Sequence, residues 1–193
     1  MSTICSQARW IIDPPAGVKL GAGSGSWERP ELVQSVILEP SLDFVDIHIY
    51  PLSNGYTDYL QVAADWASAA VAAGKEVVIG EAGLYKVSVK ELQSGMGFQE
   101  IYGRDAYSFW QPLDALFMQT IVELGRATGV RYISFFWSRY LFGYVDYAQV
   151  SPAATGAELQ QAANLASWSA FVRGELSATG REFQRLASAA EGD

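Results

Sequence analysis

The sequence predicts an α/β protein built on a parallel sheet. Short apolar runs rich in Val, Ile and aromatic residues alternate with longer segments whose apolar residues recur at helical spacing. This alternation is typical of βα units, in which a helix follows each parallel strand. Half of the 193 residues are hydrophobic and 18% are charged, which is enough apolar material for a packed core. Four such units in a row fit either half of an eight-stranded barrel or an open, doubly wound sheet.

The first two units lie in the N-terminal half of the chain. A strand is expected over 17–22, ending in a glycine-rich turn, and a helix over 30–39 because its first residue is a proline, which suits a first helical turn. The second strand is expected over 43–50, closed by a proline. Its helix begins after Asp58, a plausible N-cap, and carries a stripe of apolar residues as far as Gly74.

The third and fourth units are less evenly spaced. The third strand, 76–81, leads into a long irregular stretch over 82–110 before a helix over 112–128. The last strand is expected over 130–137, followed by a loop to about residue 155. The remainder is expected to be helical, with breaks near two glycines, Gly174 and Gly180.

Charge and composition exclude several classes of function. Thirteen Lys and Arg against 21 Asp and Glu give a net charge of -8, which repels phosphate backbones, so no nucleic acid partner is expected. One histidine, His48, and one cysteine, Cys5, cannot supply a zinc site of three or four His/Cys ligands, an internal disulfide or a CxxC redox pair. Cys5 is expected to be inert. No apolar run approaches the roughly 18 to 20 residues of a membrane span, and the N-terminal residues as written carry no export signal.

The second strand has one apolar and one polar face. Period-two alternation places Val45, Ile47 and Ile49 on one face and Asp46, His48 and Tyr50 on the other. Burying these polar groups is costly unless they bond one another or a ligand. A sheet covered by helices on both faces gives no reason for such a row, whereas a barrel does, because its strand interiors form the floor of a site at the C-terminal end.

Three further residues lie at strand ends. Glu81 ends an otherwise apolar strand and stands between glycines, in GEAG, which leaves its carboxylate uncrowded. Trp137 ends the fourth strand and offers a flat apolar surface of the kind that stacks on sugar rings. Trp27 follows the first strand and is expected at the same rim. The aromatic residues of the 82–110 stretch are further candidates for a glycan cleft: Tyr85, Phe98, Tyr102, Tyr107, Phe109 and Trp110.

His48-Ile49-Tyr50, Gly80-Glu81-Ala82-Gly83 and Trp137 together resemble the sixth, seventh and eighth strands of clan A glycoside hydrolases, especially family five. The resemblance covers about residues 17–140. It implies that Glu81 is the nucleophile of a retaining mechanism, that His48 and Tyr50 line the same sugar subsite with Asp46 beside them, and that Trp137 is a stacking platform. The implied reaction is hydrolysis of a β-linked glycan, which needs no metal or organic cofactor. Relatives of this kind are commonly secreted.

One part of the family pattern has no counterpart here. The acid/base glutamate of the clan ends strand four, and no such strand precedes residue 17. The resemblance therefore implies a single partial domain over 1–193, the C-terminal (βα)₄ half of a (β/α)₈ TIM barrel, which when complete needs about 250 residues. We expect the chain to be a piece of a longer enzyme; pairing with a second copy, or cover from its own loops and C-terminal helices, are the alternatives. Because a retaining glycosidase needs two carboxyl groups about 5 to 5.5 Å apart, the chain by itself is expected to be inactive and to self-associate.

Other interpretations stay open. The GAGSGS run at 21–26 follows a strand and precedes a helix, as in a dinucleotide-binding turn, although a serine replaces the third glycine. A non-catalytic carbohydrate-binding or interaction module would keep the aromatic surface without needing an acid. Structural roles are also possible, with Glu81 paired to Lys or Arg, His48 a core histidine and Trp137 a packing residue. A serine hydrolase is not supported, because the sequence has no GxSxG elbow.

Overall fold

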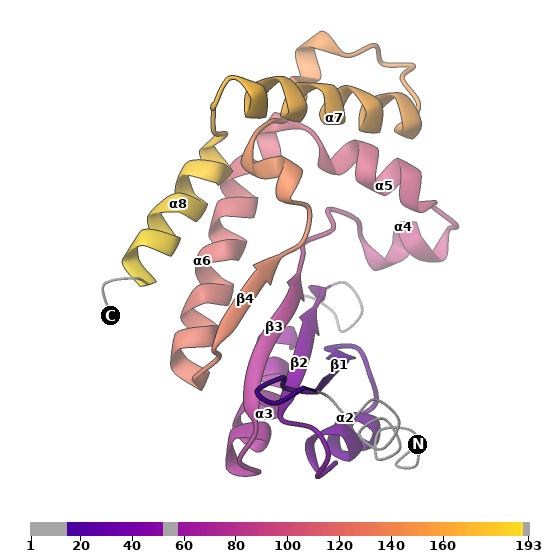
Figure 1. The fold of residues 1–193 in the computed structure, drawn as a ribbon. Coiled ribbons are helices and arrows are strands. Elements are labelled where there is room, and N and C mark those ends of the chain that lie inside the picture. The colour runs from indigo at the N-terminus through magenta and orange to yellow at the C-terminus, as the bar shows by residue number, and fades with distance from the viewer. Residues whose placement is uncertain (1–14, 52–57, 191–193) are drawn as a thin grey trace. The chain divides into compact units, whose positions relative to one another are not determined.

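A computed structural model describes residues 15–51 and 58–190 (Figure 1). The chain divides into two units. The first unit holds the described residues up to Gly83 together with Glu123–Phe135. The second holds Leu84–Val122 and the described residues from Phe136 onward. Each has its own buried core.

The first unit contains a four-stranded parallel sheet in the order β1-β2-β3-β4 (Figure 1). The prediction of an α/β protein with parallel strands and flanking helices is thereby confirmed. The strands are β1 (Gly21–Gly25), β2 (Phe44–Ile49), β3 (Glu76–Ala82) and β4 (Tyr132–Phe135).

Helices α2 (Pro30–Ile37) and α3 (Tyr59–Ala72) pack against this sheet. A proline begins α2, as expected, and Asp58 precedes α3 but makes no side-chain cap hydrogen bond. Gly74 follows α3 with φ of 76°, a left-handed conformation that glycine adopts without strain. The helices cover the apolar face of β2, where Val45, Ile47 and Ile49 are at most 1% exposed.

Strand β1 begins at Gly21, four residues later than the sequence analysis expects. Val18, in the expected strand, is 51% exposed and contributes little to the core. The glycines expected to form a turn are instead the strand, because side chains of neighbouring residues occupy the space beside them. A Cβ at Gly21 would collide with the ring of Phe44, and a Cβ at Gly25 with the ring of Trp27. The run that resembles a phosphate-binding turn is thus extended backbone, and α2 starts only at Pro30.

The second unit is mainly helical. The stretch expected to be irregular contains two short helices, and the C-terminal helices break only once, at 173–177. Its helices are α4 (Val89–Gln93), α5 (Phe98–Asp105), α6 (Gln111–Thr128), whose last residues belong to the first unit, α7 (Gly156–Val172) and α8 (Ala178–Ala190). Three 3₁₀ turns, η2 (Ser108–Trp110), η3 (Ser138–Leu141) and η4 (Tyr147–Gln149), connect them.

Glycines set the close contacts of this unit. Helices α5 and α7 lie side by side (Figure 1). They approach closely at Gly103, where a Cβ would collide with the backbone of Gly156, so this contact requires a glycine. Gly174, at φ of 69°, ends α7 as expected. Gly180 does not break a helix, which corrects the sequence analysis. It lies inside α8, where the carbonyl of Leu141 comes too close for any side chain.

An ion pair is buried in the second unit. Lys86 Nζ lies 2.5 Å from Asp114 Oδ1, and the Lys86 side chain is 1% exposed. The hydroxyl of Tyr144 donates to Asp114 Oδ2 at 2.8 Å and also bonds the Thr179 hydroxyl at 2.8 Å. The carboxylate of Asp105 accepts the backbone N–H of Lys86 at 3.0 Å. The network therefore links α5, α6 and α8. Removing one of its buried charged partners would leave the other unpaired and would lower the stability of the fold.

No helix in the described part of the chain is both long and apolar enough to cross a bilayer.

Candidate functional site

The polar face of β2 is open to solvent, whereas its apolar face is not. The side chains of Asp46 and His48 are 24% and 29% exposed. Tyr50, just beyond the strand, is 7% exposed. The predicted alternation of polar and apolar residues along this strand is confirmed.

Strand β3 carries a β-bulge opposite this face. Asp46 pairs with Val78 and His48 pairs with Glu81, so three steps along β3 match two steps along β2. The ladder with β4 shows the same offset between Ile79 and Ala82. One extra residue is therefore inserted into β3, and every later side chain changes face.

The bulge decides where Glu81 points. Val77 and Ile79 are at most 1% exposed, and strict alternation would place Glu81 with them, under the helices. Instead Ala82 is the next fully buried residue, at 1% exposure, while the Glu81 side chain is 40% exposed and lies beside His48. The carboxylate thus joins the polar face of the sheet.

Asp46 contacts the bulge itself. Its Oδ1 accepts the backbone N–H of Gly80 at 2.6 Å. A Cβ at Gly80 would overlap both carboxylate oxygens of Asp46, so only glycine allows this approach.

Four side chains form a continuous polar chain across the face. His48 Nε2 lies 3.2 Å from Asp46 Oδ2, and His48 Nδ1 lies 3.7 Å from Glu81 Oε2. The Tyr50 hydroxyl donates to the same Glu81 oxygen at 2.9 Å. Trp27, 42% exposed, lies beside Tyr50 with ring centroids 5.7 Å apart. The structure therefore brings together five of the six predicted site residues.

The Glu81 carboxylate has one engaged and one available oxygen. Oε2 faces Tyr50 and His48, whereas Oε1 makes no hydrogen bond with the residues that the structure describes. Within that same set, no Lys or Arg forms an ion pair with Glu81, in contrast to the structural role considered above. A fixed, partly exposed carboxylate with a free oxygen can act as a nucleophile or as a general base.

Trp137 belongs to the second unit. It adopts a left-handed conformation with φ of 66° and ψ of 56°, and is the sole non-glycine residue with positive φ in the described ranges. This conformation is strained for a bulky side chain. Its ring contacts Tyr102 and Phe136, with centroids 4.6 and 4.4 Å away, and the Arg139 guanidinium lies 5.0 Å from the ring.

The aromatic residues of the 82–110 stretch form two groups. Tyr85 and Phe98 join Tyr102 in a cluster that continues to Trp137. Tyr107 stacks on Phe109 at 5.4 Å, and both contact Tyr147, while Phe109 also touches Trp110. Several of these rings are strongly exposed, namely Phe98, Phe109 and Tyr147.

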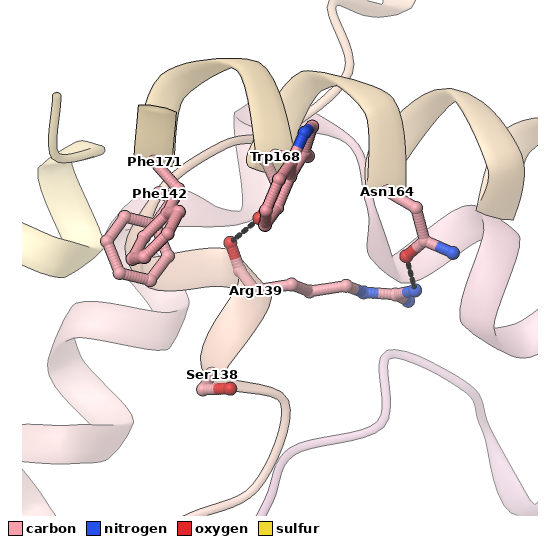
Figure 2. A pocket seen from close by; sticks show the side chains of 7 residues that line it. Ser138, Arg139, Phe142, Asn164, Trp168 and Phe171 are labelled. Carbon is pink, nitrogen blue, oxygen red and sulfur yellow. Dashed lines mark hydrogen bonds between the residues drawn. The ribbon is translucent and has the colours of Figure 1, made fainter. Parts of the chain in front are cut away.

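A pocket that the sequence analysis missed lies between η3 and α7 (Figure 2). Its volume is about 290 Å³, and three aromatic rings and four polar or charged residues line it. Arg139 Nη1 donates to Asn164 Oδ1 at 3.0 Å, which fixes the amide at one end. The lining residues are Ser138, Arg139, Phe142, Asn164, Ser167, Trp168 and Phe171. A helix that is apolar on several faces, as residues 156–172 are, was the available signal.

Residues 15–51 and 58–190 contain no group of three or more His, Cys, Asp or Glu side chains that could hold a metal ion. Cys5 lies outside these ranges.

Comparison of the chain with protein-family models, with curated proteins and with solved structures finds no match in any of the three.

Proposed function

We propose that the chain is the C-terminal half of a (β/α)₈ barrel of a retaining β-glycoside hydrolase, with Glu81 as its nucleophile. The observation that carries the proposal is the bulge in β3, which brings Glu81 onto the polar face beside His48 and Tyr50. Bulges are frequent next to active sites, where they redirect a side chain.

The order of the strands supports a barrel over a doubly wound sheet. Consecutive strands are neighbours throughout, β1-β2-β3-β4. In a doubly wound sheet the order reverses at a switch point, and the ligand binds there. In a barrel, each strand lies beside the next one and the site lies at the carboxyl ends, as Tyr50 and Glu81 do here.

The proposed reaction uses the two oxygens of Glu81 differently. Oε1 attacks the anomeric carbon of a β-linked sugar and forms a glycosyl ester, while the bond to the leaving oxygen breaks. Tyr50 donates to Oε2 and orients the carboxylate, and His48 lies beside it. Water then hydrolyses the ester: its oxygen bonds the anomeric carbon, its proton passes to a second carboxyl group, and the Glu81 carboxylate is restored.

A second carboxyl group must protonate the leaving oxygen. Asp46 is a poor candidate, because Gly80 and His48 already engage both of its oxygens. We place the acid on a segment that completes the barrel. Trp27, beside Tyr50, is proposed as a stacking surface for a sugar ring. Trp137 is proposed as a stacking surface within the second unit, a role that its strained backbone supports.

Labelling with activated fluorosugars tests the nucleophile without needing the acid. In 2-deoxy-2-fluoro-β-glycosyl fluorides the fluoride departs unprotonated, and the fluorine at carbon 2 slows hydrolysis of the ester. We expect at least one sugar of a gluco, manno, galacto and xylo panel to leave an adduct on the peptide containing Glu81, read by mass spectrometry. Glu81→Gln should not be labelled, whereas Glu76→Gln, on the same strand, should react like the wild type.

A folded wild-type protein that stays unlabelled at Glu81 with every sugar of the panel would contradict the proposed mechanism.

A carbohydrate-binding role without catalysis is the second candidate. The pocket of Figure 2 favours it, because Trp168 is 64% exposed beside the amide of Asn164, which joins a stacking surface to a hydrogen-bonding group. In glycan titrations by calorimetry, Trp168→Ala should weaken binding by roughly tenfold, equivalent to about 1.4 kcal/mol. Tyr132→Ala, which removes an exposed ring of β4, is the matched control. Equal affinity for both variants would remove this candidate.

A further inference from the structure

The Asp46 carboxylate joins two groups that each determine how Glu81 is presented. Its Oδ1 binds the amide of Gly80, which immediately precedes Glu81 in the bulge. The extra residue of a bulge falls out of the ladder, so its amide needs another acceptor. A carboxylate at 2.6 Å supplies one, in a charge-assisted bond stronger than a neutral one.

The other oxygen of Asp46 determines where His48 carries its proton. An ionised carboxylate only accepts hydrogen bonds, so the bond at 3.2 Å requires the proton on His48 Nε2. Neutral His48 then presents an unprotonated Nδ1 toward Glu81 Oε2, 3.7 Å away. Tyr50 remains the hydrogen-bond donor to that oxygen.

We propose that Asp46 is a positioning residue: it holds the β3 bulge through the Gly80 amide, which keeps Glu81 on the polar face with its hydrogen bond from Tyr50, and it also keeps the His48 proton on Nε2. Without this anchor, the regular ladder would turn residue 81 toward the side where Val77 and Ile79 are buried. The inference rests on the proposed function only in taking Glu81 as the nucleophile, and its main test involves no sugar.

Amide hydrogen exchange of the full chain tests the anchor. We expect Asp46→Ala to speed exchange at Gly80 by at least roughly tenfold, because a hydrogen bond to a charged group shifts a local opening equilibrium by such a factor. Asp46→Asn keeps an oxygen for the Gly80 amide and should change exchange by less than about threefold. His48→Ala leaves Asp46 Oδ1 in place and should also keep Gly80 protected.

Asp43→Ala is the matched control. Asp43 lies just before the same strand, and its Oδ2 accepts the backbone N–H of Leu20 at 2.8 Å, far from the bulge. This variant should expose the Leu20 amide and leave Gly80 unchanged. If Gly80 exchange is unchanged in Asp46→Ala, or if Asp43→Ala loses as much Gly80 protection, then Asp46 does not hold the bulge.

The imidazole nitrogens of His48 give a second readout that does not require Asp46→Ala to fold. At about pH 8.5, nitrogen NMR of the wild type should show the proton on Nε2. Asp46→Asn points an amide N–H at Nε2, so the proton should move to Nδ1. A wild type protonated on Nδ1, or a variant that keeps the wild-type tautomer, overturns the proposal.

Fluorosugar labelling distinguishes failure of the positioning role of Asp46 from failure of the proposed function. Loss of Gly80 protection and a tautomer change without any Glu81 labelling contradict the proposed function and leave the positioning role intact. Labelling of Glu81 at equal rates in wild type and Asp46→Asn, together with unchanged Gly80 exchange in Asp46→Ala and an unchanged His48 tautomer in Asp46→Asn, contradicts the positioning role and leaves the proposed function intact.

Discussion

At the scale of single residues, the Tyr50 hydroxyl is the side-chain group that holds the Glu81 carboxylate most closely. It donates to Oε2 at 2.9 Å, and its ring is nearly buried beside Trp27. Tyr50→Phe removes the hydrogen bond and keeps the ring, so the fold should remain intact. We expect the rate of fluorosugar labelling at Glu81 to fall by roughly tenfold, the effect of losing one hydrogen bond of about 1.4 kcal/mol.

Tyr132→Phe removes an exposed hydroxyl from β4 and serves as the control. Equal labelling rates for Tyr50→Phe and wild type would show that Tyr50 contributes packing alone.

At the scale of elements, the bulge in β3 depends on the absence of a side chain at Gly80. In Gly80→Ala, the new Cβ would overlap the Asp46 carboxylate, so the bulge or the carboxylate must move. We expect urea denaturation to show a loss of about 1–3 kcal/mol, the usual cost of overpacking. Gly97→Ala meets only the flexible Glu100 side chain and should stay within about 0.5 kcal/mol of wild type.

A capping box begins α7 in the second unit. Thr155 Oγ1 accepts the N–H of Glu158, and Glu158 Oε2 accepts the N–H of Thr155 at 2.8 Å. Thr155→Ala leaves one amide of the first turn without an acceptor and should lower the free energy of unfolding by about 1 kcal/mol. Thr155→Ser should restore it. A loss of stability as large in Thr155→Ser as in Thr155→Ala would rule out the hydroxyl as the cause.

A structural element can be predicted from the sequence when the residues that determine it lie close together in the chain. The two faces of β2 follow from a period of two and were predictable. The bulge was not, because alternation from Val77 through Ile79 places Glu81 on the buried face; Gly80 was the only local sign. The glycines of β1 form a strand for a tertiary reason, the rings of Phe44 and Trp27, against a weak intrinsic preference.

The short helix α4 had a local signal that the sequence analysis overlooked. Ser88 and Glu91 stand at the spacing of a capping box, and both of its hydrogen bonds form. The pocket between η3 and α7 could not be predicted in the same way, because its walls come from segments that only tertiary packing brings together. The grouping of Glu81 with His48 and Tyr50 was expected from the family resemblance. The bulge that brings the three side chains together was not expected from either the resemblance or the strand pattern.

At the scale of the whole molecule, stability should depend on pH through the buried network of the second unit. Burial raises the pKa of Asp105 to about 6, against an ordinary value of 3.8, despite the opposing charge of Lys86. The native protein therefore binds more protons than the unfolded chain between these values, and stability falls as the pH rises through this window. Across this window, Asp105 lowers the free energy of unfolding by up to about 3 kcal/mol.

Asp105→Asn should remove that part of the pH dependence, since its oxygen can still accept the N–H of Lys86. Urea denaturation of wild type and variant at several pH values from about 4 to 7 gives the difference between the two curves. A difference that stays constant with pH would contradict the raised pKa of Asp105.

The apolar surface of α7 predicts self-association of the whole chain. Four large side chains of this helix are more than half exposed, a patch of the kind that marks contact sites. Sedimentation should show a concentration-dependent increase in mass that the double variant Leu165→Lys, Val172→Lys reverses. A strictly monomeric wild type at all concentrations would contradict this. The four residues are Leu165, Trp168, Phe171 and Val172.

The inserted residue in β3 also makes the chain unequally tolerant of length changes. Deleting Gly80 would remove the inserted residue, so a regular ladder would keep Glu81 on the polar face and Ala82 on the buried face. Deleting one residue from the turn at 173–177 would only shorten a connection between two helices. A library of single-residue deletions should therefore keep folded members at the turn and at Gly80, and lose them in β2, whose pairing with β1 contains no extra residue.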